Sequence, residues 1–443
     1  MSVQELLVER PQLSIGAVLV IGVLVAAVSA FMPLLSVMII GATLLLLVLG
    51  LSRSLILAIL VMSGTVDLFT GFNLGPISTM GLLTILYAAG SWAIWAMRPR
   101  WTPQRMPTAL PLLMLLGWGV IGVFLWYTPS VNSMQNLLVI ASFLGILVLS
   151  ARDNRDTTIA PQTFEKVFEF AIVAASGFYV LTRVTGSIGG FGVGVRTYAL
   201  FALVGLAWYV AGWRCGSRRS LWFAVALLAL LVMSLSRTAM VLGLFLFPLA
   251  QLRLNRLSGW LRLAVWGTLA LVILYAGISY FEPLRSRFFE GDTSLQVAGI
   301  SINAEGRVNA WEAVLDSYRE SPWLGKGAGS SEEVIKELFP ALGHPHNDYL
   351  RILHDYGLIG FGLWLVGYFG LLRVTWRAWL AAADRDAGHG RVHLAAFLAL
   401  VAMGLAMLTD NVIVYIFVMA PLAALVGASL GMMEDRPQCE SST

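Results

Sequence analysis

Long apolar runs separated by short polar turns constrain this chain more than any other feature of its sequence. Of its 443 residues, 58% are hydrophobic and 12% carry a charge, which is about half the charged share of a typical soluble domain. Runs of roughly 17–22 apolar residues are long enough for a helix to cross a bilayer. We therefore predict an all-α polytopic membrane protein with 12–14 transmembrane helices. The fourteen candidate spans are 13–31, 33–51, 54–70, 77–97, 108–126, 132–150, 164–184, 196–213, 220–235, 238–251, 262–281, 357–379, 392–409 and 411–432.

Charge distribution predicts the orientation of these spans. The net charge is only +4, and the arginines are scattered between apolar runs, a pattern that indicates topology and argues against nucleic acid as a partner. Most basic residues fall on one side if both termini are cytoplasmic. The first apolar run has no small-residue cleavage site after it, so we expect a retained span in the bacterial inner membrane and not a signal peptide. Cys215 and Cys439 both fall on the inner side, and no disulfide is expected.

The apolar runs and one long polar interval suggest four segments. Residues 1–163 are predicted to form N-terminal transmembrane helices, and residues 164–281 central ones with a short periplasmic loop at 185–196. A large helical periplasmic loop is expected over 282–356, followed by C-terminal transmembrane helices and a short cytoplasmic tail over 357–443.

The polar interval itself predicts helices that form a lid over a membrane cavity. An amphipathic helix is expected over Asn303–Glu320, and the spacing of Ser330 and Glu333 matches a capping box that opens a helix through Leu338. A third helix is expected to start after Pro345 and to run into the membrane. The apolar face of the first helix would consist of Val308, Trp311, Leu315 and Tyr318.

The stretch from Gly343 to Gly360 concentrates polar groups in a very apolar protein. His346 follows Pro345, where a helix N-terminus would disfavour a positive charge and keep the imidazole neutral. A neutral imidazole can serve as a general base near pH 7; the alternative is that His346 caps the helix or packs against the lid. A zinc site formed by His344, His346 and His354 is a weaker alternative, because no HExxH motif or cysteine pair accompanies it.

Three arginines, Arg183, Arg196 and Arg237, lie at the outer ends of spans, against the topological rule. Desolvation there is costly unless an anion compensates it. Snorkelling to lipid headgroups is the simpler interpretation, particularly for Arg183. Compensation by an anion or another partner is the alternative, and we favour it for Arg196 and Arg237.

Four segments occur in an order that resembles a known family. RTYAL begins at Arg196, SLSRTA contains Arg237, and GRVNAW contains Arg307 and is followed by PWLGKGAG. His346 and Asn347 then begin the pattern HN-x9-G-x2-G. This set resembles the superfamily of O-antigen ligases and Wzy-type O-antigen polymerases over roughly residues 175–430. One departure is that many members carry an asparagine in the segment corresponding to 189–200, where this chain reads GGFGVGVRTYAL.

The resemblance implies a membrane glycosyltransferase that acts at the periplasmic face without a metal or cofactor. It would move a glycan from undecaprenyl diphosphate to a sugar hydroxyl by an inverting displacement. His346 would be the general base, and Arg196, Arg237 and Arg307 would stabilise the leaving diphosphate. The residues that we expect to bind substrate around them are Arg183, Asn347, His344, Asp348, Lys326 and Arg285.

Three functions remain open at this point. A ligase would transfer the glycan to lipid A–core, whereas a polymerase would transfer it to another lipid-linked repeat unit, for O-antigen or exopolysaccharide. A polysaccharide or lipid transporter or flippase is the alternative of another class, and it would be expected to carry charges at the membrane midplane. The sequence DRD at 384–386 is interpreted as a solvated cytoplasmic turn and not as a metal-binding motif.

Overall fold

The computed structural model shows a helical protein. The described residues are 55–63, 73–74, 77–97, 108–125, 130–156, 159–186, 192–252, 257–290, 295–297, 300–302, 306–340, 342–382 and 387–433. The first two predicted spans, the DRD turn and the C-terminal tail lie outside them. The number of 12–14 spans therefore stays a prediction.

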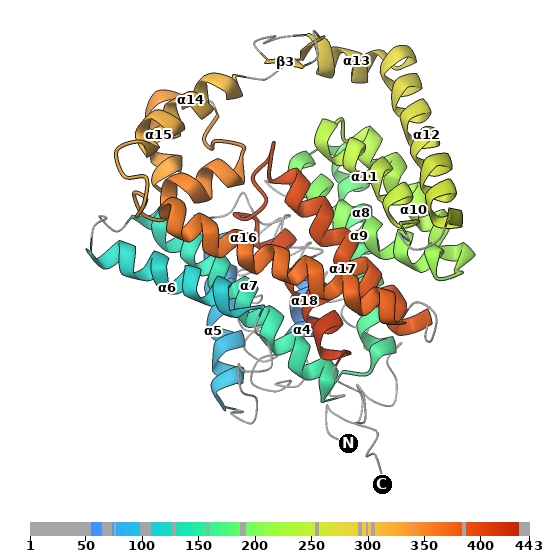
Figure 1. The fold of residues 1–443 in the computed structure, drawn as a ribbon, viewed down its shortest axis with the longest axis horizontal. Coiled ribbons are helices and arrows are strands. Elements are labelled where there is room, and N and C mark those ends of the chain that lie inside the picture. The colour runs from blue at the N-terminus through green and yellow to red at the C-terminus, as the bar shows by residue number, and fades with distance from the viewer. Residues whose placement is uncertain are drawn as a thin grey trace.

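Helices account for nearly all of the regular structure (Figure 1), as the apolar runs predict. Six of them, α7, α8, α9, α12, α16 and α17, are long and apolar enough to cross a membrane, and α5, α6, α11 and α18 are shorter apolar helices. The chain is thus an all-α polytopic membrane protein. The helices in and around the bundle are α4 (Leu55–Ser63), α5 (Thr79–Met97), α6 (Leu110–Leu125), α7 (Val131–Arg155), α8 (Pro161–Thr185), α9 (Val195–Arg214), α10 (Arg218–Met233), α11 (Arg237–Leu249), α12 (Leu257–Tyr280), α16 (Asp348–Ala382), α17 (Ala387–Ala406) and α18 (Ile416–Gly431).

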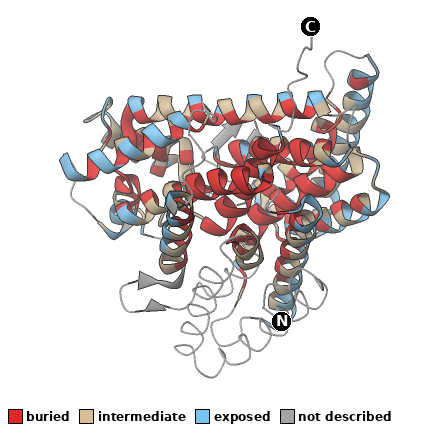
Figure 2. Ribbon diagram, turned by 90° about the horizontal axis from the view of Figure 1, so that it is seen from below, coloured by how far each residue is buried: buried red, intermediate tan, exposed pale blue. Residues whose placement is uncertain are grey.

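The centre of the bundle is formed by helices that are apolar on every side. All sixteen residues of α18 are buried, and α9 is buried from Tyr198 to Gly212, as expected of helices without a solvent or lipid face. Buried residues fill the middle of the molecule in Figure 2. Small residues bring α18 close to α7: a Cβ at Gly427 would lie within 3.1 Å of the backbone nitrogen of Ala151, a packing mode that is common between membrane helices.

Helix α12 lies at the periphery and exposes its apolar side chains. None of its most apolar window is buried within the protein, and Trp266 packs against Trp213 and Phe247 to hold it to its neighbours. An apolar helix with this exposure is expected to face lipid.

The segment of residues 282–347 crosses the top of the view in Figure 1, between α12 and α16. It contains α13 (Glu282–Phe289), α14 (Arg307–Tyr318) and α15 (Ser330–Leu338), as well as a short hairpin of β3 (Leu295–Val297) and β4 (Ile300–Ile302) that the sequence did not predict. A second short hairpin, β1 (Asn73–Leu74) with β2 (Ile77–Ser78), precedes α5. Helices α14 and α15 share a small apolar core of Ala310, Val314 and Ile335. The 282–347 segment therefore has a folded helical part with its own packing.

Helix α15 begins and ends where the sequence predicts, but the predicted capping box is wrong. Ser330 is the first helical residue, and the N-cap is Gly329 in the left-handed conformation, which has no side chain to cap with. The carboxylate of Asp355 takes over this role by accepting hydrogen bonds from the amides of Gly329 and Ser331, both at 2.8 Å. A carboxylate at a helix N-terminus is stabilised by the helix dipole, so α15 is fastened to α16.

Helix α16 is interrupted at Gly357, whose backbone has φ 66° and ψ −173°. The glycine-rich turn 322–329 packs against this interruption. The amide of Lys326 donates to the carbonyl of His354 at 3.0 Å, and the amide of Leu358 donates to the carbonyl of Pro322 at 2.9 Å. These bonds satisfy backbone groups that the break in the helix would otherwise leave unpaired. The predicted third helix of the polar interval is thus the first part of α16, and it continues into the bundle.

Candidate active site

His346 lies in the loop that joins α15 to α16, two residues before α16 begins at Asp348. Its backbone is left-handed, with φ 51°, which is uncommon for a residue other than glycine. Two contacts hold the loop in this shape: the amide of His346 donates to Asn411 Oδ1 at 3.1 Å, and Trp311 Nε1 of α14 donates to the carbonyl of Pro345 at 2.7 Å. The side chain of His346 is buried. The predicted position of His346 just before a helix N-terminus is confirmed.

Two arginines from distant parts of the chain lie near this imidazole. Arg196, the second residue of α9, places its Nη1 3.2 Å from Nε2 and 3.4 Å from Nδ1 of His346. Arg307, the first residue of α14, donates from Nη1 to the carbonyl of Thr409 at 2.8 Å. The carboxylate of Asp410 lies on the same side, with Oδ1 3.8 Å from His346 Nδ1. The structure thus brings Arg196, Arg307 and His346 together.

These surroundings disfavour a second positive charge. Burial lowers the pKa of His346 below its ordinary value, and the nearby guanidinium groups of Arg196 and Arg307 lower it further, against the opposing effect of Asp410. Desolvation and like charges both penalise the protonated ring. These surroundings therefore favour the neutral form of His346.

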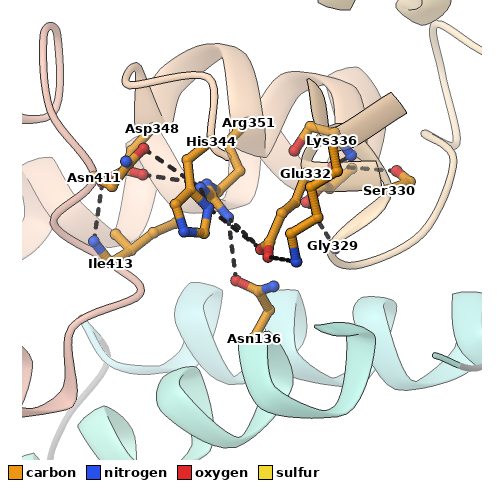
Figure 3. Close-up of polar contacts among 12 residues, drawn as sticks. Asn136, Gly329, Ser330, Glu332, Lys336, His344, Asp348, Arg351, Asn411 and Ile413 are labelled. Atoms are coloured by element: carbon orange, nitrogen blue, oxygen red, sulfur yellow. Dashed lines mark hydrogen bonds and ion pairs between the residues drawn. The ribbon is translucent and has the colours of Figure 1, made fainter. Parts of the chain in front are cut away.

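A second cluster is centred on Arg351, which is buried in the first part of α16 (Figure 3). Its guanidinium faces Asp348 Oδ1 at 3.4 Å, Glu332 Oε2 at 3.7 Å and His344 Nδ1 at 3.2 Å. It also reaches Asn136 of α7 at 3.5 Å. Because a buried charge needs partners, these contacts connect α7, α15 and the loop before α16.

Glu332 is the acidic partner that α15 contributes to this cluster. Burial alone would raise the pKa of Glu332, but its hydrogen bonds and charge interactions with His344, Lys336 and Arg351 lower the pKa to about 2. Lys336 Nζ lies 2.7 Å from Glu332 Oε1. Glu332 is thus a stable anion that balances the buried Arg351 guanidinium.

Three of the predicted substrate-binding residues have structural partners. Asn347 Oδ1 accepts from the amide of Leu350 at 3.1 Å and so caps α16. Asp348 accepts from the amides of Val412 and Ile413 through Oδ2 and faces Arg351 through Oδ1. His344 belongs to the Arg351 cluster, as described above.

The structure does not bring the other predicted basic residues to His346. Lys326 Nζ contacts Glu320 and Ser317, while Arg285 lies on α13 beside Glu282 at 3.9 Å. Arg183 is exposed in the last turn of α8. The roles of these residues in substrate binding stay predictions.

Arg237 opens α11, and its Nη1 donates to the carbonyl of Arg287 at 3.0 Å. Its guanidinium lies over the ring of Phe288. The neighbouring Thr238 reaches towards the site, with Oγ1 2.8 Å from Thr409 Oγ1. Arg237 therefore lies at the edge of the site, with its side chain directed to α13.

The predicted zinc set does not converge. His354 is buried between Ser330 Oγ, 3.1 Å from its Nδ1, and Ser317 Oγ, 3.0 Å from its Nε2. His344 instead faces Arg351 and Glu332. His354 thus joins α14 and α15 to α16, apart from His346.

Sequence reasoning missed Asp410 and Asn411, which lie in the loop between α17 and α18. The predicted spans 392–409 and 411–432 include Thr409 and Asn411 and leave only Asp410 between them, so the polar triplet Thr409–Asp410–Asn411 does not stand out as a unit. All three residues contact the site: Thr409 through Arg307, and Asp410 and Asn411 through His346. A polar triplet at the predicted outer end of two apolar runs was the signal that could have identified them.

Comparison with known families agrees with this geometry. Residues 222–365 match the family described as O-antigen ligase. Over these residues the chain resembles an O-antigen ligase domain. This domain includes Arg307 and His346, whereas Arg196 precedes it and Asn411 follows it. No curated protein matches the chain.

Proposed function

We propose that this protein transfers a glycan from undecaprenyl diphosphate to a sugar hydroxyl at the periplasmic face of the inner membrane. The O-antigen ligase domain supports the class of reaction. The finer assignment depends on one observation: Arg196 and Arg307, from helices far apart in the sequence, converge with a neutral His346 beside the end of the membrane bundle.

The chemistry of the transfer calls for such a cluster. The acceptor oxygen forms a bond to the anomeric carbon while the bond from that carbon to the diphosphate oxygen breaks, and the electron pair leaves with the diphosphate. Cations that are already positioned beside the oxygen where this negative charge develops stabilise the transition state, because the protein need not rearrange during the reaction. Guanidinium groups also present several N–H donors in the geometry of phosphate oxygens. Arg196 and Arg307 both lie close enough to His346 to affect its charge, so both are candidates for this role.

Basic residues at the opposite end of the bundle support a periplasmic position of the site. Helix α9 carries Arg196 in its first turn and Arg214 in its last. Near that second end, Arg391 of α17 pairs with Glu169 at 2.7 Å and lies over the ring of Trp208. An excess of arginine marks the cytoplasmic end of membrane helices. The His346 end would then face the periplasm, where a lipid-linked glycan is presented.

The acceptor distinguishes a ligase from a polymerase, and we favour the ligase reaction onto lipid A–core. In a strain that lacks this protein, mass spectrometry of lipid-linked glycans should then show accumulation of complete polymer on the lipid carrier. Accumulation of single repeat units would instead assign the polymerase reaction, which uses another lipid-linked repeat unit as acceptor.

A direct test is transfer in proteoliposomes that contain a lipid-linked glycan and an acceptor. Arg307→Ala should reduce transfer at least about 100-fold, the scale of losing one transition-state donor. Arg319→Ala is a matched control, because Arg319 follows the same helix but is exposed and pairs with Asp316 at 2.6 Å. Equal transfer by the two variants would show that the arginines near His346 do not act on the donor.

A further inference from the structure

Asn411 lies beside His346, and its amide orientation is fixed by its neighbours. Its Oδ1 is 3.1 Å from the backbone nitrogen of His346 and 3.4 Å from Nη2 of Arg351. Both of these groups donate hydrogen bonds and accept none. The oxygen of the Asn411 amide must therefore face them, and its nitrogen must face the other way.

The nitrogen of this amide then decides the protonation of the imidazole. Asn411 Nδ2 is 2.9 Å from His346 Nδ1, an ordinary hydrogen-bond length. An amide nitrogen only donates, so Nδ1 must accept and carry no proton. Asp410 Oδ1, the acceptor that would favour a proton on Nδ1, is 3.8 Å away, which is too far for a hydrogen bond. A neutral His346 therefore carries its proton on Nε2.

Arg196 does not provide an acceptor for that proton. Its Nη1 is almost equally distant from the two ring nitrogens, at 3.2 and 3.4 Å, so it does not lie along the in-plane direction of either one. A guanidinium nitrogen also has no lone pair to offer. Among the hydrogen bonds of the described residues, Nε2 thus meets only a cation. An N–H group beside a cation is suited to an anionic oxygen from a ligand.

We propose that Asn411 is a positioning residue that holds the proton of His346 on Nε2, so that His346 donates a hydrogen bond to the lipid-linked diphosphate. This inference rests on the proposed glycan transfer and changes the role predicted for His346 from general base to hydrogen-bond donor. The proton of the acceptor hydroxyl then ends on the released diphosphate, which gains the electron pair of the broken bond. His346 returns to the same state after each turnover.

The effect of Arg196 and Arg307 on the ring is consistent with this arrangement. A protonated His346 would direct a hydrogen from Nδ1 at the hydrogens of Asn411 Nδ2, and its positive charge would oppose both arginines. Burial lowers the pKa of His346, Asp410 acts in the opposite direction, and the charges of Arg196 and Arg307 add to the lowering, so that the net shift is downward. The neutral ring with a single proton on Nε2 is the form that suits Asn411, Arg196 and Arg307, while the Asp410 carboxylate lies 3.8 Å from Nδ1.

The test is to exchange the donor on Asn411 for an acceptor. In Asn411→Asp one carboxylate oxygen can still accept from the His346 amide and Arg351, while the other replaces Nδ2 and favours a proton on Nδ1. Asn136→Asp is the matched control, because Asn136 also faces Arg351 but does not contact His346. Solid-state NMR of protein labelled with 15N-histidine in lipid bilayers reports which ring nitrogen is protonated, and His346→Gln identifies the signal among the five histidines.

We expect His346 to show a protonated Nε2 in the unmodified protein and in Asn136→Asp, and a protonated Nδ1 in Asn411→Asp. Transfer by Asn411→Asp should fall about 100-fold or more. A protonated Nδ1 in the unmodified protein overturns the proposal, even if Asn411→Asp fails to fold. A reversed proton position with undiminished transfer overturns the donor role and restores the general base. Absence of transfer by the unmodified protein would refute the proposed function, while the spectra, recorded without glycan, would still decide the position of the proton.

Discussion

Replacing Gly357 by alanine should weaken the attachment of the 322–329 turn to α16. Gly357 has φ 66° and ψ −173°, a conformation that is essentially restricted to glycine. A Cβ atom at this position would lie 2.5 Å from the backbone nitrogen of Gly325 and closer still to the carbonyl oxygen of Trp323. These neighbours are backbone atoms, so they cannot yield by a change of rotamer.

The magnitude follows from two separate costs. Holding a residue with a side chain in this backbone region costs about 1–3 kcal/mol, and forcing an extra methyl group into a filled space costs typically about 1–3 kcal/mol. We expect the sum, about 2–6 kcal/mol, to appear as local opening of the 322–329 turn. His354 and Asp355, which contact α14 and α15, lie just before Tyr356 and Gly357. Local opening at Gly357 should therefore loosen α14 and α15 as well.

Hydrogen exchange measured by mass spectrometry in detergent or nanodiscs can follow this opening. Gly357→Ala should increase exchange of the amides of Lys326, Gly327 and Leu358, which bond across the junction. Gly362→Ala is the matched control, since a Cβ there meets no atom within 4 Å and alanine favours a helix over glycine. Unchanged exchange at these amides in Gly357→Ala would refute the steric argument. Faster exchange in both variants would show that the effect is not specific to the junction.

Three further predictions concern the charges of the site. The neutral ring of His346 is the active form, and the pKa of His346 is lowered, so kcat/KM should fall only below the ordinary histidine pKa of about 6.5. Arg307→Gln removes one of the charges that lower this pKa. In a pH–rate profile of this variant, the acidic decline of kcat/KM should therefore begin at higher pH. Arg196→Lys keeps the charge but loses the planar guanidinium beside His346, and kcat should fall about 100-fold in the proteoliposome assay; near-normal kcat would refute a specific need for arginine. Arg351→Ala leaves Asp348 buried beside no cation and should destabilise the fold by about 3–5 kcal/mol, seen as a lower unfolding temperature; an unchanged temperature would contradict this.

The helices of the bundle were predictable because apolar length determines them almost alone. The expected spans at 196–213 and 220–235 correspond closely to α9 and α10, and the helix at Ser330 was placed by local polar spacing. The face of α14 was predicted less well, since Ala310 and Val314 are its most buried residues. A short helix that packs against two others buries a face that its own periodicity does not specify.

The partners of the site residues could not be predicted, because they come from distant segments. His346 contacts Arg196 from 150 positions earlier and Asn411 from 65 positions later. The sequence indicated that His346 and the arginines are unusual for their location. The resemblance grouped Arg196, Arg237 and Arg307 with His346. The structure brings Arg196 and Arg307 near His346, whereas Arg237 is directed to α13.

The His346 cluster and the Arg351 cluster lie close together, but they differ in whether their arginines have carboxylate partners. Arg351 faces two buried carboxylates, Asp348 and Glu332, so its charge is balanced within the fold and its role is to connect helices. Arg196 lies beside a neutral imidazole, and no ion pair with a carboxylate is seen for it among the described residues. Arg196 is exposed, but its guanidinium lies against the buried ring of His346, and a cation with no carboxylate beside it favours an anionic ligand. The diphosphate of a lipid-linked glycan would supply that missing negative charge. Arg196 and Arg351 are linked by contacts through His346 and Asn411. Even so, we expect substitution of Arg196 to reduce transfer and substitution of Arg351 to reduce stability.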